Sequence, residues 1–480
     1  MLRGVIYCVA LLLCSVICAK VPSRILRQAV LLTVSYALYL SWGPWFAAVL
    51  GVSTVANFLL GEWLRRRPSW PALSAGVALN LALLGSFKYL PEFAADIPFS
   101  SLQKFAHIAL PLGISFWTFQ AISYLFDLYR GEELNPSLIE FALYMAFFPV
   151  AISGPICRMP DMLPQFRSPE LTPWTARGRG FQRIATGVLM MLLAKLLGQG
   201  ILAGDGINRG FDHATRWSGP DVWCLAFGYG LQLFFDFAGY SHIAIGAAQA
   251  MGFTVPENFA RPFQSTTPSI FWTRWHMSLS FWIRDYVFLP LAMMRRGAWW
   301  RNFVLVIAMV LFGLWHKATL LFVLWGCYHG ALLVLHRQVQ QLQRKLDWTP
   351  PAAAWAWLSW IATISLISLG WIFFRANSLS EARQMLSAVL SPAGYASHFL
   401  SGSLYVLVLA LAAGYEIVLL VADALERNSC EPETQPPAML WFARWRWFWL
   451  PPLYALALIF VLIITLTRAA DTAQFMYRGF

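Results

Sequence analysis

The sequence predicts an all-α integral membrane protein that crosses the bilayer many times. Of its 480 residues, 59% are hydrophobic and only 12% are charged, whereas about 25% of residues are charged in a typical soluble protein. Long apolar runs recur along the chain, without the alternating ten-residue strands of an outer-membrane barrel. This composition excludes a disordered chain and a coiled coil. It also argues against a soluble enzyme, whose surface so few polar residues could not cover.

The apolar runs define the expected spans. A complete crossing needs about 20 residues, and several runs are shorter, so we expect about ten to twelve transmembrane helices plus partial ones. We treat 1–480 as a single membrane-embedded domain, with N-terminal helices (1–90), a catalytic core (100–385) and C-terminal helices (386–480). The runs lie near 4–19, 28–42, 44–62, 71–90, 105–126, 137–157, 184–204, 221–235, 303–315, 318–335, 355–374, 403–424 and 446–467.

The basic residues indicate an orientation. The formal charge is +12, but the cations fall in short clusters between apolar runs, such as the arginines at 65–67. Such clusters are typical of cytoplasmic loops, so no nucleic-acid partner is predicted. The clusters place the N-terminus outside and Glu92 and Asp96 in an outer loop. Residues 1–19 could be a signal peptide, but Ile17 fits a cleavage site poorly, which favours a retained helix.

Two segments are expected to enter the membrane without a simple crossing. Run 137–157 contains Pro149, Gly154 and Pro155, which break helices, and basic loops flank it. Segment 302–336 also has basic residues at both ends, which favours a helical hairpin with its tip near His316. Its first arm, 303–315, would reach roughly 20 Å, short of the ~30 Å hydrocarbon core. Interfacial or re-entrant pieces are expected over 253–300, and WFARWRWFW at 441–449 is typical of an interfacial anchor.

His329 is the best candidate for a general base. It lies in an apolar arm between Gly326 and Gly330, which permit close approach of another helix or a substrate. A desolvated imidazole tends to stay neutral, as a base must. A structural histidine bonded to a neighbouring carbonyl remains an alternative. On one helix His316 would be roughly 20 Å from His329, so a metal pair is not expected and no metal site is predicted.

Charged residues in apolar surroundings have two interpretations. Asp236, Lys88 and Arg375 could pair across helices or mark a substrate path. Arg284 and Asp285 are adjacent, so a helix would direct them differently. Structural pairing is the favoured interpretation for all five charged residues. The seven cysteines include no CxxC pair, so the sequence suggests neither zinc binding nor a disulfide framework.

Several long motifs stand in a fixed order along the chain. They are FKY at 87–89, LPLGISFWTFQAISYLFDLYRGE at 110–132, FALYMAFFPVAISGPICR at 141–158, LQLFFDFAGYSHIAIGAAQAMGFTVPENFARPF, FWTRWHMSLSFWIRDYVFLPL, GLWHKATLLFVLWGCYHG and GWIFFRANSLSEA. Together they resemble the membrane-bound O-acyltransferase family, in its bacterial alginate O-acetyltransferase-like branch. The resemblance is strong over about 80–385. Departures are Tyr240-Ser241-His242 where the family usually has YSD, Trp315-His316-Lys317 where it has WHG, and the ending QFMYRGF.

The resemblance implies a fold with helices around a central passage, in which an acyl group moves from a thioester to a hydroxyl. His329 matches the family's essential histidine, His276 a second sensitive position and His316 the recurring WH position. With these three catalytic candidates, we expect the following residues along the passage: Trp275, Trp315, Trp325, Tyr328, Asp236 and Arg284.

The expected function is transfer of acetyl from a cytoplasmic thioester across a bacterial inner membrane, for O-acetylation of an exopolysaccharide such as alginate or cellulose. No bound cofactor is expected, and acetyl-CoA or another acyl thioester would be the co-substrate. The resemblance also implies periplasmic polysaccharide acyltransferase partners. D-alanyl transfer to teichoic acid is one alternative. A transporter or flippase is another, although such folds often pair broken helices in both halves, whereas the unusual segments here are concentrated in the middle.

Overall fold

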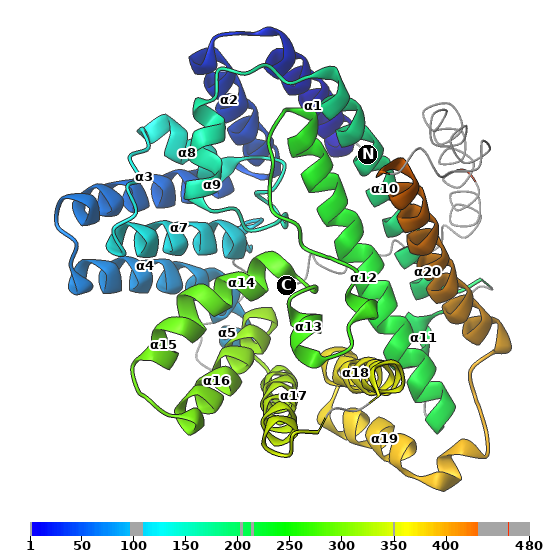
Figure 1. Cartoon of the computed structure of the whole chain (residues 1–480). Coiled ribbons are helices and arrows are strands. Elements are labelled where there is room, and N and C mark those ends of the chain that lie inside the picture. Colours follow the sequence, from blue (N-terminus) through cyan, green and yellow to red (C-terminus); the bar gives the residue numbers. More distant parts are fainter. Residues whose placement is uncertain are drawn as a thin grey trace. The chain divides into compact units, whose positions relative to one another are not determined.

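The computed structural model confirms an all-α protein (Figure 1). Its one isolated β-bridge in the part of the chain that is described joins Phe259 and Trp275. The predicted run 446–467, the anchor at 441–449 and the histidines at 107 and 213 lie outside the described residues. The structure describes residues 2–96, 109–201, 205–212, 216–348, 351–430 and 459.

Within these ranges, nine helices are long and apolar enough to span a membrane. This confirms a polytopic protein. The shorter apolar helix Gly4–Lys20 lies within α1 (Leu2–Lys20). The nine helices are α2 (Arg24–Trp42), α3 (Pro44–Arg66), α4 (Trp70–Lys88), α10 (Trp174–Gln199), α12 (Gly219–Ala250), α16 (Ala298–His316), α17 (Leu320–Lys345), α18 (Ala352–Arg375) and α20 (Gly402–Cys430).

The other helices are shorter and several are single turns. Among them, η2 is a π-helix, in which the backbone hydrogen bonds span five residues. They comprise α5 (Leu90–Asp96), α7 (Ile114–Tyr129), α8 (Leu138–Ala146), α9 (Met159–Arg167), α11 (Ile207–Asp212), η1 (Pro262–Gln264), α13 (Pro268–Trp272), α14 (Met277–Ile283), η2 (Arg284–Phe288), α15 (Leu289–Met293), α19 (Leu379–Leu390) and η3 (Pro392–Tyr395).

The chain forms two compact units. Unit 1 contains residues 1–184, 240–262 and 272–304, and unit 2 contains 185–239, 263–271 and 305–480. Each unit is assembled from segments that are far apart in the sequence. The candidate residues are therefore divided between them: His276, Trp275 and Arg284 belong to unit 1, and the others to unit 2.

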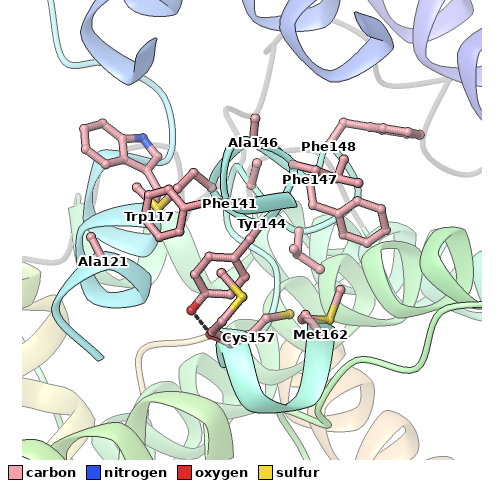
Figure 2. Close-up of a cluster of buried hydrophobic side chains, with 14 of the residues drawn as sticks. Trp117, Ala121, Phe141, Tyr144, Ala146, Phe147, Phe148, Cys157 and Met162 are labelled. Atoms are coloured by element: carbon pink, nitrogen blue, oxygen red, sulfur yellow. Dashed lines mark hydrogen bonds between the residues drawn. The ribbon is translucent and has the colours of Figure 1, made fainter. Parts of the chain in front are cut away.

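In unit 1, the predicted helix break near Pro149 is confirmed. Helix α8 ends at Ala146, and the chain stays irregular until α9 begins at Met159. Whether this segment is re-entrant remains a prediction. The irregular stretch is anchored inside the unit, where the Tyr144 hydroxyl donates to the Cys157 carbonyl oxygen at 3.0 Å. Figure 2 shows the buried side chains around this bond: Trp117, Ala121, Phe141, Ala146, Phe147, Phe148 and Met162.

The hairpin predicted over 302–336 is present as α16 and α17. The two helices are antiparallel and closely packed. A methyl group on Gly326 would lie 2.5 Å from Cα of Val310, and one on Gly330, further along α17, would lie 2.9 Å from Cα of the earlier residue Val306. The glycines thus permit the close helix approach that the sequence predicts. The predicted length of the first arm was wrong, because α16 begins at Ala298. Its length is roughly 28 Å, close to that of a full span.

Candidate functional site

His329 is fully buried in unit 2, with 0% of its surface exposed. It lies on α17 among the rings of three other aromatic residues. Its ring centroid is 4.7 Å from that of Trp325, 5.4 Å from that of Tyr328 and 6.4 Å from that of Trp371. The Tyr328 hydroxyl donates to the Leu366 carbonyl oxygen at 2.7 Å, which ties α17 to α18 beside the imidazole.

Gly370 brings the backbone of α18 against the His329 imidazole. A methyl group at this position would lie 2.4 Å from Nε2 and 2.8 Å from Cε1 of His329. Real Cβ atoms do not approach other atoms this closely, so only glycine fits here without a shift of the ring. The position of the His329 ring on α17 is therefore constrained by Gly370 on the following helix, α18.

His316 ends the other arm of the hairpin and is also buried. Its ring centroid lies 5.0 Å from that of Phe374 and 6.0 Å from that of Trp325. Trp325 therefore contacts both His316 and His329. The hairpin turn brings the two histidines to one aromatic cluster, although thirteen residues on a single helix would separate them by roughly 20 Å.

The aromatic cluster includes residues that the sequence did not single out. Phe312 stacks on His316 with the planes 16° apart, and Phe374 is 4.9 Å from Phe322 by ring centroids. Trp315, which was predicted, lies 4.6 Å from His316. The sequence motif GWIFFRAN contains Gly370, Trp371 and Phe374. Nothing in that motif indicates which histidine α18 contacts.

His276 lies in unit 1, with 1% of its surface exposed. Its backbone has φ 44° and ψ 52°, the left-handed conformation that residues other than glycine rarely adopt. Burial lowers the pKa of its imidazole to about 3. The preceding residue, Trp275, is buried and forms the β-bridge with Phe259.

The pairing interpretation is confirmed for Arg284 and Asp285. Although they are adjacent on a helical turn, these neighbours form an ion pair, with 2.7 Å between Nε and Oδ1, in the π-helix η2. Asp285 also accepts from Arg158 at 2.8 Å, and the Tyr286 hydroxyl donates to Asp127 at 2.7 Å. π-Helical turns are frequent at functional sites.

Two of the other intramembrane charges have defined neighbours. Arg375 forms an ion pair with Asp212 at 2.6 Å, which supports the pairing interpretation. The Lys88 ammonium lies 5.8 Å from the Tyr89 ring centroid. Asp236 is buried on α12 in unit 2. Across the described ranges, no group of three or more His, Cys, Asp or Glu side chains is arranged to hold a metal ion.

His329 is thus buried within an all-helical fold that has nine candidate membrane spans in the described ranges. A sequence profile of the membrane-bound O-acyltransferase family matches residues 99–376. The chain therefore belongs to the membrane-bound O-acyltransferase family, and it is a multi-pass membrane O-acyltransferase.

Named relatives cover most of the chain. It is 34% identical over 383 residues to the protein named Probable alginate O-acetylase AlgI of Pseudomonas putida, with 76% of this chain and 75% of that protein aligned. It is 30% identical over 398 residues to the Peptidoglycan O-acetyltransferase of Helicobacter pylori, covering 75% and 73%. Identity to the Teichoic acid D-alanyltransferase of Bacillus subtilis is 31% over 276 residues, covering 55% and 68%.

Proposed function

We propose that the protein transfers acetyl groups for the O-acetylation of an exopolysaccharide such as alginate or cellulose, with His329 as the general base. The complete burial of His329 within the hairpin's aromatic cluster is the observation that supports this role most directly. The names of the two acetyltransferase relatives, which align with about three quarters of the chain, support acetyl as the group transferred and a cell-envelope polymer as the acceptor.

The chemistry needs one imidazole and a site without water. The acceptor hydroxyl gives its proton to a basic ring nitrogen of the neutral His329 imidazole as its oxygen attacks the thioester carbonyl. The tetrahedral intermediate then collapses, the carbon–sulfur bond breaks, and the imidazolium returns the proton to the departing thiolate. The products are an acetate ester and a free thiol. Surrounding aromatic rings favour transfer over hydrolysis because they exclude water.

The proposed route runs through one membrane-embedded domain of a bacterial inner membrane. An acetyl thioester, acetyl-CoA or another carrier, approaches from the cytoplasmic side, and periplasmic polysaccharide acyltransferase partners complete the O-acetylation. His276 and His316 assist His329. The residues proposed along the passage are Trp275, Trp315, Trp325, Tyr328, Asp236 and Arg284.

The decisive experiment replaces His329 with alanine and measures polymer-bound acetyl by mass spectrometry. We expect a loss of at least ~100-fold, the usual contribution of a general base, at an unchanged level of protein in the membrane. His336→Ala is the matched control, because His336 is a partly exposed histidine on the same helix. Full acetylation in His329→Ala cells would refute the assignment of the base.

D-alanyl transfer to teichoic acid is the second candidate. The similarity to the Teichoic acid D-alanyltransferase of Bacillus subtilis supports it, but that alignment covers a smaller share of this chain than the acetyltransferase alignments do. The same mass spectra distinguish the two reactions, because alanyl esters carry an amine and acetyl esters do not. Alanyl esters that disappear in His329→Ala cells would favour the second candidate.

A further inference from the structure

The backbone of His276 is held in a conformation that it would not adopt alone. For an L-residue other than glycine, φ 44° brings Cβ too close to the following carbonyl oxygen. Such a conformation persists only where the surrounding structure imposes it, and such positions concentrate at functional sites. The groups that impose it on His276 are therefore of interest for the reaction.

Asn258 is bonded to the chain directly after His276. Its carbonyl oxygen accepts from the Met277 backbone N–H at 2.9 Å, and its side-chain Oδ1 accepts from the Ser278 hydroxyl at 2.6 Å. Before His276, the Ala260 N–H donates to the Arg274 carbonyl oxygen at 3.0 Å. The chain around Asn258 thus holds both sides of His276, which leaves its backbone little freedom.

The side chain of Asn258 also connects this clamp to α12 and to the broken segment after α8. Its Nδ2 donates to the Ser241 hydroxyl at 3.0 Å. The Ile156 N–H donates to the Ser278 hydroxyl at 3.1 Å, so that hydroxyl directs its own proton to Asn258. The Ser278 hydroxyl therefore uses both its donor and one of its acceptor sites, and it joins the broken segment to Asn258.

The network is buried throughout. Asn258 has 0% of its surface exposed, and Ser241 and Ser278 are buried as well. A buried polar network with satisfied bonds is rigid, and the loss of one member leaves the others unpaired without water to replace it. All of these residues belong to unit 1, so the arrangement is complete within one compact part of the chain.

We propose that the Asn258 side chain is a positioning group for His276: through its bonds to Ser278 and Ser241 it fixes the clamp whose backbone bond to Met277 holds the left-handed conformation from which the His276 imidazole projects. This inference rests on the proposed function, because it takes His276 as part of the acetyl-transfer machinery. Asn258 itself contacts no reacting atom in this proposal.

The test is a double-mutant cycle on polymer acetylation, normalised to the amount of folded protein measured by size-exclusion chromatography in detergent. We expect Asn258→Ala to lower acetylation by about 10- to 100-fold, the scale of a misplaced catalytic group. In a His276→Ala background, Asn258→Ala should cause no further loss. A purely structural role would instead lower activity by the same factor in both backgrounds.

Two further variants keep the test decisive. Asn258→Asp keeps the acceptor for Ser278 and can accept from the Ser241 hydroxyl, so its acetylation should be at least ~10-fold higher than that of Asn258→Ala. If His276→Ala abolishes acetylation and the cycle cannot be read, this comparison tests the positioning role instead. If Asn258→Ala does not accumulate, Ser278→Ala replaces it, because it removes the bonds of Ser278 to Asn258 and Ile156 but keeps the bond between Asn258 and Ser241. Asn57→Ala is the matched control, since it removes a buried amide of unit 1 that bonds to Asn80 instead.

Four results would overturn the inference: full activity in Asn258→Ala, full activity in His276→Ala, equal losses in the two backgrounds, or no recovery in Asn258→Asp. Failure of the proposed function is recognised separately, because it requires His329→Ala to retain acetylation. If His329→Ala is inactive, and the loss in the Asn258→Ala/His276→Ala double variant equals the product of the two single losses, only the positioning role is rejected.

Discussion

At the scale of single residues, glycines decide how closely the helices of unit 2 approach His329. The sequence places Gly326 and Gly330 beside His329, and their role in helix approach is confirmed by their contacts with α16. Gly370 was not predicted, although a methyl group at this position would lie 2.4 Å from Nε2 of His329. A sequence shows the spacing within one helix, but it does not show which residue of a later helix will face it.

The contact between Gly370 and His329 leads to a prediction. Gly370→Ala places a methyl group 2.4 Å from Nε2 of His329, so the ring has to move. We expect acetylation to fall by about 100-fold, because displacement of a catalytic group by about 1 Å has such an effect, while the protein still accumulates. Gly414→Ala on α20 is the matched control, because nothing lies within 4 Å of its added methyl group. Unchanged acetylation in Gly370→Ala would show that the ring does not need its present position.

At the scale of elements, the prolines of the sequence predicted where a helix ends, whereas the adjacency of two charged residues did not predict how their side chains are directed. Pro149 and Pro155 correctly predicted the break after α8. Arg284 and Asp285 would point in different directions on a regular helix, yet they form the ion pair that the favoured interpretation expects. The residue types of RDYVF do not indicate that this segment is a π-helix.

The start of α8 gives a pH prediction. Glu140 accepts two hydrogen bonds from Arg167, at 2.8 and 2.9 Å, and completes a capping box with Ser137. The bond from Arg167 is the main cause that lowers the pKa of Glu140 from 4.5 to about 2. Because the folded pKa is the lower one, the stabilisation is complete above about pH 4.5 and is lost as the pH falls toward 2.

We therefore expect Glu140→Gln to melt about 2–4 °C below the parent protein at pH 7, equivalent to about 1 kcal/mol, and the gap to narrow as the pH falls to 3. Thermal unfolding in detergent measures both. Ser23→Ala removes the N-cap bond of α2, which involves no carboxylate, so its effect should not change with pH. A Glu140→Gln gap that stays constant from pH 7 to pH 3 would contradict the ion-pair account.

At the scale of the whole molecule, composition alone was enough to predict the class of fold. A chain with 12% charged residues and repeated apolar runs has too few polar side chains to form a water-exposed surface, so much of its surface has to face lipid. In agreement, nine candidate spans are found in the described ranges. The division into two interleaved units could not be predicted. It depends on contacts between segments such as 1–184 and 272–304, and such pairings leave no periodic signal in the sequence.

The orientation of the molecule can be tested directly. The arginines at 65–67 end α3, and the positive-inside tendency places them in the cytoplasm. In a cysteine-free background, Arg66→Cys should react with a membrane-impermeant maleimide only after the inner membrane is opened. Glu92→Cys, on α5, should react in spheroplasts that remain intact. The reverse pattern would invert the proposed route of the thioester.

Helix α12 is buried over much of its length: in its most apolar 18-residue stretch, 89% of the residues are hidden inside the protein. Its 32 residues extend roughly 48 Å, well beyond the thickness of the hydrocarbon layer. Because most residues of this stretch are buried inside the protein and do not face lipid, their side chains need not be apolar. Polar side chains such as Gln232, Asp236 and Ser241 are accommodated there, so lipid composition should influence α12 far less than it influences α20, whose corresponding stretch is only 17% buried.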